Sequence, residues 1–305
     1  MSPVPPSLLS APSPSARRQV ALITAGAVAL FVGFRLLPTG TNLSHMDFRV
    51  SGGNSIEFCD PSNPQFLPVV NVRSPVTMAL QPGAAPVTGA EVNLVVTLKT
   101  GSGKPIEPVD LLVSHTRLLH LLIVDPTLGD YQHVHPEPAS VPGEWTVTFL
   151  PRQAGNYRVF ADFTPAATGR GLYASADLVV AAGAVTPAGA PPDDQRWNFS
   201  LVPAAPLRAG APADLKLTVT NAAGGNVPLQ PVMGAFAHLV AFDGARSGFA
   251  HLHPMETDLL APPDAVRPQL NFKVTIPEAG RYMIWAQVNL GGIEVFRPFA
   301  IEVGN

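Results

Sequence analysis

Cysteine, charged residues and histidine are all scarce in this sequence of 305 residues. It contains 1 cysteine, Cys59, so no disulfide can form within the chain. Zinc ribbons and covalent haem attachment are also excluded, because both need more than one cysteine. Charged residues make up 13% of the chain, the net charge is −3, and no block of basic residues occurs. Nucleic-acid binding therefore has no electrostatic basis, and we expect no nucleic-acid partner.

Proline and glycine, by contrast, are abundant, with 34 and 26 residues respectively. Both residues interrupt long helices and favour turns. From about Phe66 onward, short runs of alternating apolar and polar residues lie between such turn signals, a pattern typical of β-strands. Composition and patterning together predict an all-β protein.

The N-terminal region contains a long apolar segment. It runs without interruption from Val20 to Phe34 and follows Arg17 and Arg18. The run is short for a membrane span, but residues 36–37 extend it if Arg35 directs its charge to the membrane interface. The two arginines before the run predict a cytoplasmic N-terminus, because positive charge is retained on that side.

We expect residues 19–38 to form an uncleaved transmembrane signal anchor, since no small-residue cleavage site follows the run at a suitable distance. Residues 1–18 would then be a disordered cytoplasmic leader, and residues 39–65 a juxtamembrane linker. The chain after about Pro38 would lie outside the cytoplasm. A cleaved signal peptide and a buried core helix are the alternatives.

The remainder of the chain contains one pattern twice. "AEVNLVVTLKTGSGKP" corresponds to "ADLKLTVTNAAGGNVP", and "PRQAGNYRVFADF" corresponds to "PEAGRYMIWAQV". A segment rich in alanine, glycine and proline, residues 183–195, separates the two copies. Each copy contains enough short strands for an immunoglobulin-like (Ig-like) β-sandwich. The sequence thus predicts tandem Ig-like β-sandwiches, residues 66–182 and 196–305, following one N-terminal transmembrane helix.

Most histidines lie in or beside two matching windows, although the chain has only 8 of them. The windows are "HLLIVDPTLGDYQHVHP", which begins at His120, and "HLVAFDGARSGFAHLHP", which begins at His238. Each contains a histidine, then twelve residues, then His-x-His-Pro. The three histidines persist although many residues between them differ, which favours a shared role for them.

Each window has the pattern of a β-hairpin with a short loop. In the expected register His120 lies opposite His135, and His133 lies opposite Leu122. Because alternate side chains of a strand share a face, all three imidazoles fall on one face. Directly opposed Cβ atoms lie about 4.5–5.5 Å apart, within reach of a single ion. The same construction in the second copy gathers His238, His251 and His253.

Three imidazoles on a rigid surface suit copper, zinc, nickel or iron. A fourth ligand has a candidate five residues before each window, namely His115 in the first copy and Met233 in the second. Methionine favours Cu(I) over zinc. This odd spacing puts the residue on the wrong strand face, so it needs a loop or bulge, which Gly234 could supply. We therefore expect copper as the cofactor, with zinc as the alternative.

A structural histidine cluster is the competing interpretation, because a buried histidine commonly binds a carboxylate or a carbonyl group. Asp125 and Asp243 recur beside the windows and could serve as such partners, although each also suits a hairpin turn. Asp162 and Gln287 occupy matching positions on a later strand. They could be outer partners of the ligands, but exposed strand residues are the favoured interpretation.

The two windows, in "LHLLIVDPTLGDYQHVHPE" and "GAFAHLVAFDGARSGFAHLHP", resemble a motif of small extracytoplasmic Ig-like modules of the YtkA-like type. Such modules occur in poorly characterised bacterial secreted or membrane-anchored proteins, and the resemblance covers residues 66–304. It implies a bacterial origin and export, but no established activity. Together with the expected signal anchor, this predicts a single-pass protein of the bacterial cytoplasmic membrane. Periplasmic copper carriers are similar in architecture, but this chain lacks their methionine-rich tracts.

These observations favour a non-enzymatic, membrane-anchored extracytoplasmic protein that holds one metal ion per sandwich. Its role would be to handle the metal or deliver it to a protein partner. One alternative is an adhesion or assembly module whose histidine clusters are structural. Another is a zinc-dependent hydrolase. The sequence offers that enzyme no nucleophile motif such as G-x-S-x-G, and we assign no catalytic residue.

Overall fold

The computed structural model describes residues 13–36, 64–183 and 196–305. The chain divides into two compact units, Met1–Gly53 and Asn54–Asn305, and each is described by itself. Most of the expected leader and of the two expected linkers lies outside the described residues, as does Cys59.

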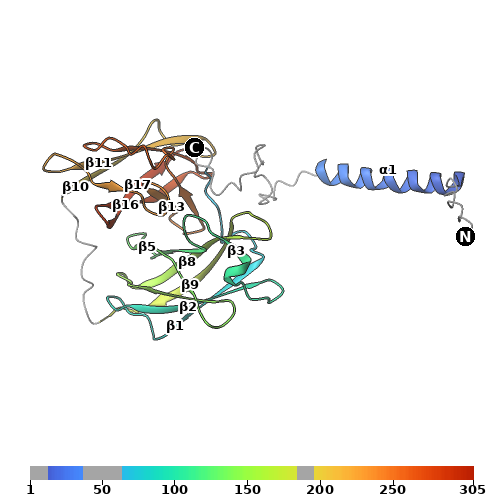
Figure 1. The fold of residues 1–305 in the computed structure, drawn as a ribbon, viewed down its shortest axis with the longest axis horizontal. Helices are drawn as coiled ribbons and strands as arrows, with labels where there is room; N and C mark the ends of the chain where they lie inside the picture. The colour runs from blue at the N-terminus through green and yellow to red at the C-terminus, as the bar shows by residue number, and fades with distance from the viewer. Residues whose placement is uncertain (1–12, 37–63, 184–195) are drawn as a thin grey trace, which may run out of the picture. The chain divides into compact units, whose positions relative to one another are not determined.

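Helix α1 (Pro14–Leu36) contains the apolar N-terminal segment and is the blue helix in Figure 1. The Ser13 hydroxyl accepts a hydrogen bond from the Ala16 backbone N–H at 3.2 Å and so satisfies one free donor of the first turn. The stretch Pro14–Gly33 has a mean hydropathy of 1.2 and no buried residue. Helix α1 is therefore long and apolar enough to cross a membrane, a criterion that a signal sequence also meets.

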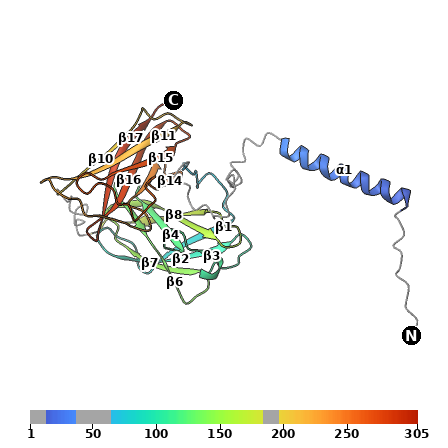
Figure 2. The same cartoon turned by 45° about the horizontal axis from the view of Figure 1, so that its top comes forward.

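The first sandwich packs two antiparallel sheets together and is drawn in cyan to yellow-green in Figures 1 and 2. Its strands are β1 (Val76–Pro82), β2 (Val92–Thr100), β3 (Leu111–Leu112), β4 (Leu119–Val124), β5 (Tyr131–Val134), β6 (Glu137–Pro138), β7 (Glu144–Phe149), β8 (Gly155–Pro165) and β9 (Leu172–Val180). One sheet has the order β1–β2–β7–β6. In the other, β4 lies between β5 and β8, and both β3 and β9 pair with β8.

The second sandwich repeats this arrangement and is drawn in orange to red. Its strands are β10 (Trp197–Pro203), β11 (Pro212–Asn221), β12 (Leu229–Gln230), β13 (His238–Asp243), β14 (Phe249–Leu252), β15 (Gln269–Thr275), β16 (Gly280–Leu290) and β17 (Ile293–Val303). One sheet has the order β10–β11–β15. In the other, β13 lies between β14 and β16, and β12 and β17 pair with β16. The all-β prediction of tandem sandwiches after one N-terminal helix is confirmed.

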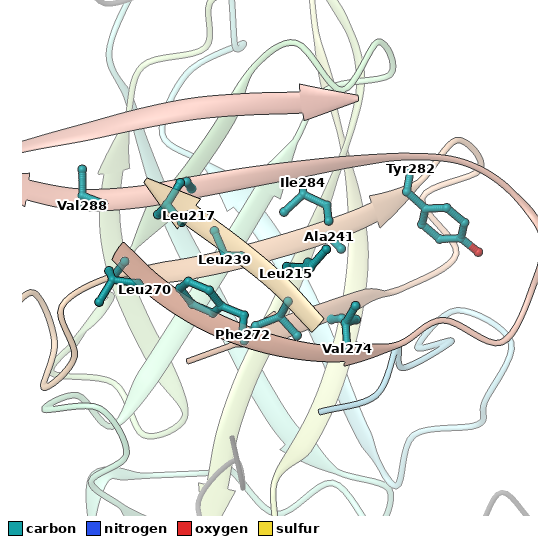
Figure 3. Close-up of a cluster of buried hydrophobic side chains, with 14 of the residues drawn as sticks. Leu215, Leu217, Leu239, Ala241, Leu270, Phe272, Val274, Tyr282, Ile284 and Val288 are labelled. Carbon is teal, nitrogen blue, oxygen red and sulfur yellow. The ribbon is translucent and has the colours of Figure 1, made fainter. Parts of the chain in front are cut away.

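Each sandwich has a core built by strand alternation. In β11, Leu215 and Leu217 are almost fully buried, whereas Asp214 and Lys216, next to them in the sequence, are not. Figure 3 shows these two leucines packed among side chains from the facing sheet, including Leu239 of β13. Removing this apolar area from water is the main stabilising contribution.

Two buried tyrosines at equivalent positions tie a turn to the following strand. The Tyr157 hydroxyl donates to the Gln153 carbonyl at 3.0 Å, and the Tyr282 hydroxyl donates to the Glu278 carbonyl at 3.1 Å. A tyrosine that bonds back to the backbone a few residues upstream is typical of Ig-like sandwiches. The feature occurs in both copies, as expected for a duplicated domain.

The β4–β5 hairpin has the register expected from the sequence. Leu122 pairs with His133, and Val124 pairs with Tyr131. In the second sandwich Val240 pairs with His251, the equivalent pairing. The predicted registers are therefore confirmed, and the three histidines of each hairpin share a face.

Both faces of strand β4 are buried, which explains its unbroken apolar sequence. Leu121 and Ile123 point into the core of the first sandwich. On the opposite face, Leu122 and Val124 contribute to a third cluster, which contains residues of both sandwiches. Its buried members are Val69, Leu122, Val124, Leu128, Tyr131, Phe160, Val240, Phe242, Phe249 and Trp285. The two histidine-bearing hairpins therefore lie where the sandwiches meet.

The contacts in this third cluster occur in equivalent pairs. Tyr131 lies 5.9 Å from Trp285 between ring centroids, and the matching residues Phe249 and Phe160 are 5.3 Å apart. Likewise, Tyr131 lies 5.9 Å from Phe296, and Phe249 lies 5.5 Å from its counterpart Tyr173. Reciprocal contacts between matching residues are the signature of a two-fold relation. The sandwiches thus meet through an approximate two-fold axis.

A short segment before β1 packs on the second sandwich. The Phe66 N–H donates to the Thr275 carbonyl at 3.1 Å, and Leu67 pairs with Phe249 of β14. This approach requires glycine at position 248, because a Cβ on Gly248 would lie 1.7 Å from the Leu67 carbonyl oxygen. The segment therefore ties the start of the first sandwich to the second hairpin.

Candidate metal centres

Two groups of three histidines stand at the interface between the sandwiches. Triad A consists of His120, His133 and His135, and triad B consists of His238, His251 and His253. Within each triad the ring nitrogens that face inward lie within 4.8 Å of one another. Five of the six side chains are buried, and His135 is half-buried. The structure thus brings together all six histidines that the hairpin pattern predicted.

In triad A the outward-facing nitrogens are tied to acceptors. His120 Nε2 lies 2.9 Å from the Ser114 carbonyl oxygen, and His133 Nδ1 lies 2.9 Å from Gln287 Oε1. The Gln287 amide is oriented by a second bond, because its Nε2 donates to Glu294 Oε2 at 2.7 Å. Both imidazoles must therefore donate their N–H outward.

The inward-facing nitrogens of triad A are consequently unprotonated. His120 Nδ1 and His133 Nε2 face each other at 3.1 Å. A neutral imidazole carries one N–H, and both rings use theirs outward, so two lone pairs point at one another. His135 Nε2 is also buried without a hydrogen-bond partner among the described residues. A cation between the three nitrogens would turn this repulsion into attraction.

Triad B repeats the arrangement atom for atom. His238 Nε2 lies 2.9 Å from the Val232 carbonyl oxygen, and His251 Nδ1 lies 3.4 Å from Asp162 Oδ2. His238 Nδ1 and His251 Nε2 then face each other at 3.1 Å. In the described part of the chain, His253 Nε2 likewise has no hydrogen-bond partner.

Burial favours the neutral form of five of these imidazoles. Together with the neighbouring imidazoles, it holds the pKa values of His133, His251 and His253 well below their ordinary range. Burial also lowers the pKa of His135 to about 3 and that of His238 to about 4. Neutral imidazole is the form that coordinates metal ions, so these rings are ready to act as ligands at neutral pH.

The outer partners of the triads are exchanged between the sandwiches. In the sheets, Asp162 pairs with His120 and Gln287 pairs with His238, each within its own sandwich. Their side chains nevertheless bond to the other sandwich, Asp162 to His251 and Gln287 to His133. Both side chains are buried. Their matching strand positions are visible in the sequence, but nothing there shows that the side chains cross the interface.

The expected fourth ligands, His115 and Met233, occupy equivalent tight turns. Ser114 and Arg117 bond to each other on either side of the first turn, and His115 and the next residue have φ values of 48° and 69°. In the second, Met233 and Gly234 have φ values of 49° and 81°. Positive φ at both central residues defines a type I′ turn. The bend required for these side chains is therefore present in both copies.

Asp125 and Asp243 stabilise the hairpin loops. The Asp125 carboxylate accepts hydrogen bonds from Thr127 N and Asp130 N at 2.9 and 2.8 Å. Asp243 Oδ1 accepts one from Ser247 N at 2.7 Å. The sequence left two functions open for these residues, namely partner of a buried histidine and stabiliser of a hairpin turn. The structure supports the second function.

An open cleft of about 710 Å³ borders triad A. His133 and His135 form part of its wall, together with Glu137 of the first sandwich and Glu294 of the second. Arg117 lies on the same wall, 3.6 Å from Glu137 between charged atoms. Triad A thus has a route to solvent that carries acidic groups.

Comparison with known proteins bears on the duplication. A family described as "Domain of unknown function (DUF8832)" matches residues 71–180 and again residues 193–305. The chain belongs to the DUF8832 family. The double match confirms that this DUF8832 protein contains a duplicated domain, whereas the YtkA-like resemblance stays a prediction. No curated protein matches the sequence.

Among solved structures, the DUF8832 chain is similar to a transglutaminase from red sea bream at 11% identity and a TM-score of 0.26, over 77% of this chain and 32% of that one. It is also similar to a DUF4785 family protein from Legionella pneumophila at 10% identity and a TM-score of 0.24, over 74% and 56%. It is similar as well to alpha-2-macroglobulin from E. coli at 15% identity and a TM-score of 0.24, over 75% of this chain and 17% of that one. The chain spans less than two thirds of each of these proteins, and likeness at this level says nothing about activity.

Proposed function

We propose that this protein binds one metal ion in each histidine triad, copper in preference to zinc, and that it handles or delivers the metal outside the cytoplasm. The observation that carries the proposal is the pair of inward-facing, unprotonated nitrogens 3.1 Å apart in each triad. Between two neutral imidazoles a hydrogen bond does not explain that distance, because the outward bonds take both N–H groups. Coordination to one cation explains it in both copies.

The donor set supports a borderline transition metal. Three imidazoles suit copper, zinc, nickel or iron, whereas calcium and magnesium require oxygen ligands. Outward hydrogen bonds from ligand histidines to carbonyl or carboxylate oxygens are the usual outer partners of a metal centre. Copper stands first because it forms the most stable complexes with such ligands.

The cellular setting follows from helix α1 and the charges before it. We propose that α1 anchors the chain in a bacterial cytoplasmic membrane and that both sandwiches lie on the extracytoplasmic side. The domain bounds of the proposal are residues 66–182 and 196–305, joined by residues 183–195. A carrier in this position would pass its metal to a protein partner that docks near the open cleft beside triad A.

Metal content tests the proposal. The full chain, purified in detergent and dialysed against copper or zinc, should retain about two equivalents per chain by elemental analysis. His133→Ala/His135→Ala should lose the ion of triad A. The matched control is His45→Ala, which replaces the histidine that lies neither in nor beside the windows, and it should retain both ions. An unmodified chain that retains no metal would contradict the proposal and leave the structural-cluster alternative.

The zinc-hydrolase alternative has one observation in its favour. The cleft beside triad A carries two carboxylates, Glu137 and Glu294, and one of them could serve as a general base beside a zinc-bound water. Zinc-loaded protein should then hydrolyse an activated ester faster than Glu137→Gln and Glu294→Gln variants do. Equal rates for all three proteins would exclude this use of the cleft.

A further inference from the structure

His115 belongs to the first sandwich but lies against the triad of the second. Its ring centroid is 4.1 Å from that of His253, and it lies 5.7 Å from His251 and 6.0 Å from His238. Only one of its ring contacts, 5.9 Å from His120, is to triad A. His115 therefore borders all three members of triad B.

The His115 ring has a free nitrogen. His115 Nε2 is buried and finds no hydrogen-bond partner among the described residues, as is also true of His253 Nε2 beside it. An unpaired buried nitrogen costs about 1–3 kcal/mol unless something offsets it. The type I′ turn that carries His115 adds a further cost, because Thr116 is β-branched and has a φ of 69°. A fold that keeps both costs points to a use for this ring.

We propose that His115 is the fourth ligand of triad B, supplied across the interface by the first sandwich. The inference rests on the proposed metal binding and specifies how the second centre is completed. His115 lies outside the set of atoms within 4.8 Å of one another, so its side chain must rotate toward the ion when it coordinates. Its place at the tip of a two-residue turn permits this rotation without moving a strand.

The two-fold relation assigns the counterpart. His115 and Met233 occupy the same turn, and the equivalent of His253 is His135. By this relation Met233 would approach His135 as His115 approaches His253. Triad A would then receive a thioether sulfur from the second sandwich where triad B receives a fourth imidazole.

The two centres would consequently differ in metal preference. Four imidazoles backed by the Asp162 carboxylate suit a divalent ion such as Zn²⁺ or Cu²⁺. Three imidazoles and a thioether, backed by the neutral Gln287 amide, suit Cu(I), because sulfur is a soft ligand. One chain would thus hold the metal in two forms, and each centre would require both sandwiches to be in contact.

A cysteine at position 115 tests the ligation directly. In a Cys59→Ser background, His115→Cys should bind Co²⁺ with a thiolate-to-cobalt charge-transfer band in the near ultraviolet. The band should disappear in His115→Cys/His253→Ala and remain in His115→Cys/His135→Ala. A thiol that merely lies nearby gives no such band. Its absence, or its dependence on His135 in place of His253, would overturn the inference.

An affinity measurement tests the same ligand without introducing sulfur. His115→Ala should weaken one of the two Zn²⁺ affinities by at least about tenfold, the lower limit for losing even an outer partner of a metal ligand. Met233→Ala should leave that affinity unchanged and weaken Cu(I) binding measured under anaerobic, reducing conditions. Thr116→Ala, in the same turn and exposed, is the matched control and should retain both.

The outcomes separate this inference from the proposed function. An unmodified chain that binds neither copper nor Co²⁺ nor Zn²⁺ means that metal binding itself fails. Two bound ions with unchanged affinities in His115→Ala mean that the triads bind metal but that His115 is not a ligand. Circular dichroism of each metal-free variant shows whether it folds, and the charge-transfer experiment decides the question in any variant that does.

Discussion

Triads A and B have the same internal geometry but different surroundings. Both hold their facing nitrogens 3.1 Å apart. In both, the first histidine donates its outward N–H to a backbone carbonyl in the tight turn that precedes its strand. Triad A is backed by the amide of Gln287 and borders an open cleft. Triad B is backed by the carboxylate of Asp162 and borders His115. Duplication thus preserved the ligands while their neighbours diverged, and the neighbours set how each centre would differ in charge and access.

The largest effect should come from breaking the interface that both triads share. Trp285 is 8% exposed, and its Nε1 donates to the Leu128 carbonyl of the other sandwich at 3.1 Å. Trp285→Ala should lower the free energy of unfolding by about 3–5 kcal/mol in denaturant titration. It should weaken metal binding at both triads, because each takes an outer partner from across the interface. Phe160→Ala removes the equivalent residue of the first sandwich and should do the same. Loss at only one triad would contradict a shared interface.

Exchanging the outer partners should exchange the affinities of the two centres. Asp162→Gln removes a buried negative charge behind His251 and should weaken Zn²⁺ binding at triad B by about 10–100-fold. Gln287→Asp should strengthen binding at triad A, since a carboxylate makes the ligand imidazole more electron-rich. Competition titrations with a coloured chelator measure both constants. If the double variant Asp162→Gln/Gln287→Asp leaves the order of the two Zn²⁺ affinities unchanged, the outer partners do not cause the difference in affinity between the triads.

Acid should destabilise the metal-free protein through both triads. Burial lowers the pKa of His135 in triad A to about 3 and that of His238 in triad B to about 4, below the ordinary value of 6.5. The unfolded chain then binds more protons than the folded one between the lowered and the ordinary values, so stability is present above pH 6.5 and is lost as pH falls toward the lowered values. Denaturant midpoints at a series of pH values measure the slope. His135→Gln and His253→Gln should each reduce this dependence of stability on pH. An unchanged slope in both variants would contradict its assignment to the buried histidines.

The smallest effect should come from the charge at the mouth of the cleft. Arg117 and Glu137 form an exposed ion pair at 3.6 Å, so Arg117→Ala should change the stability of the fold by less than about 1 kcal/mol. It should accelerate exchange of the triad A ion, because a positive charge no longer lies on the route to solvent. Stopped-flow release to a chelator should show two phases in the unmodified protein. Only the fast phase, which we assign to triad A, should change in Arg117→Ala, and a change in the slow phase would contradict that assignment.

Much of each centre could be predicted from the sequence because all three histidines of a triad lie in one hairpin, close together along the chain. The loop between the two hairpin strands fixes their register, and strand alternation then places His120, His133 and His135 on one face. The recurrence of the pattern at His238 predicted the second triad. These features depend on residues within a single hairpin, so sequence spacing is sufficient to find them.

The tertiary structure alone decided how the two hairpins face each other. Asp162 and Gln287 matched in sequence, but exposed strand positions were the favoured interpretation, because nothing in either copy indicates a partner across the interface. His115 was expected to complete a site on its own sandwich, and it lies instead against His253 of the other. Docking of the sandwiches depends on the shapes of two complete surfaces, contributed by residues more than a hundred positions apart. Local residue spacing therefore defines the two triads, whereas docking of the sandwiches defines what surrounds them.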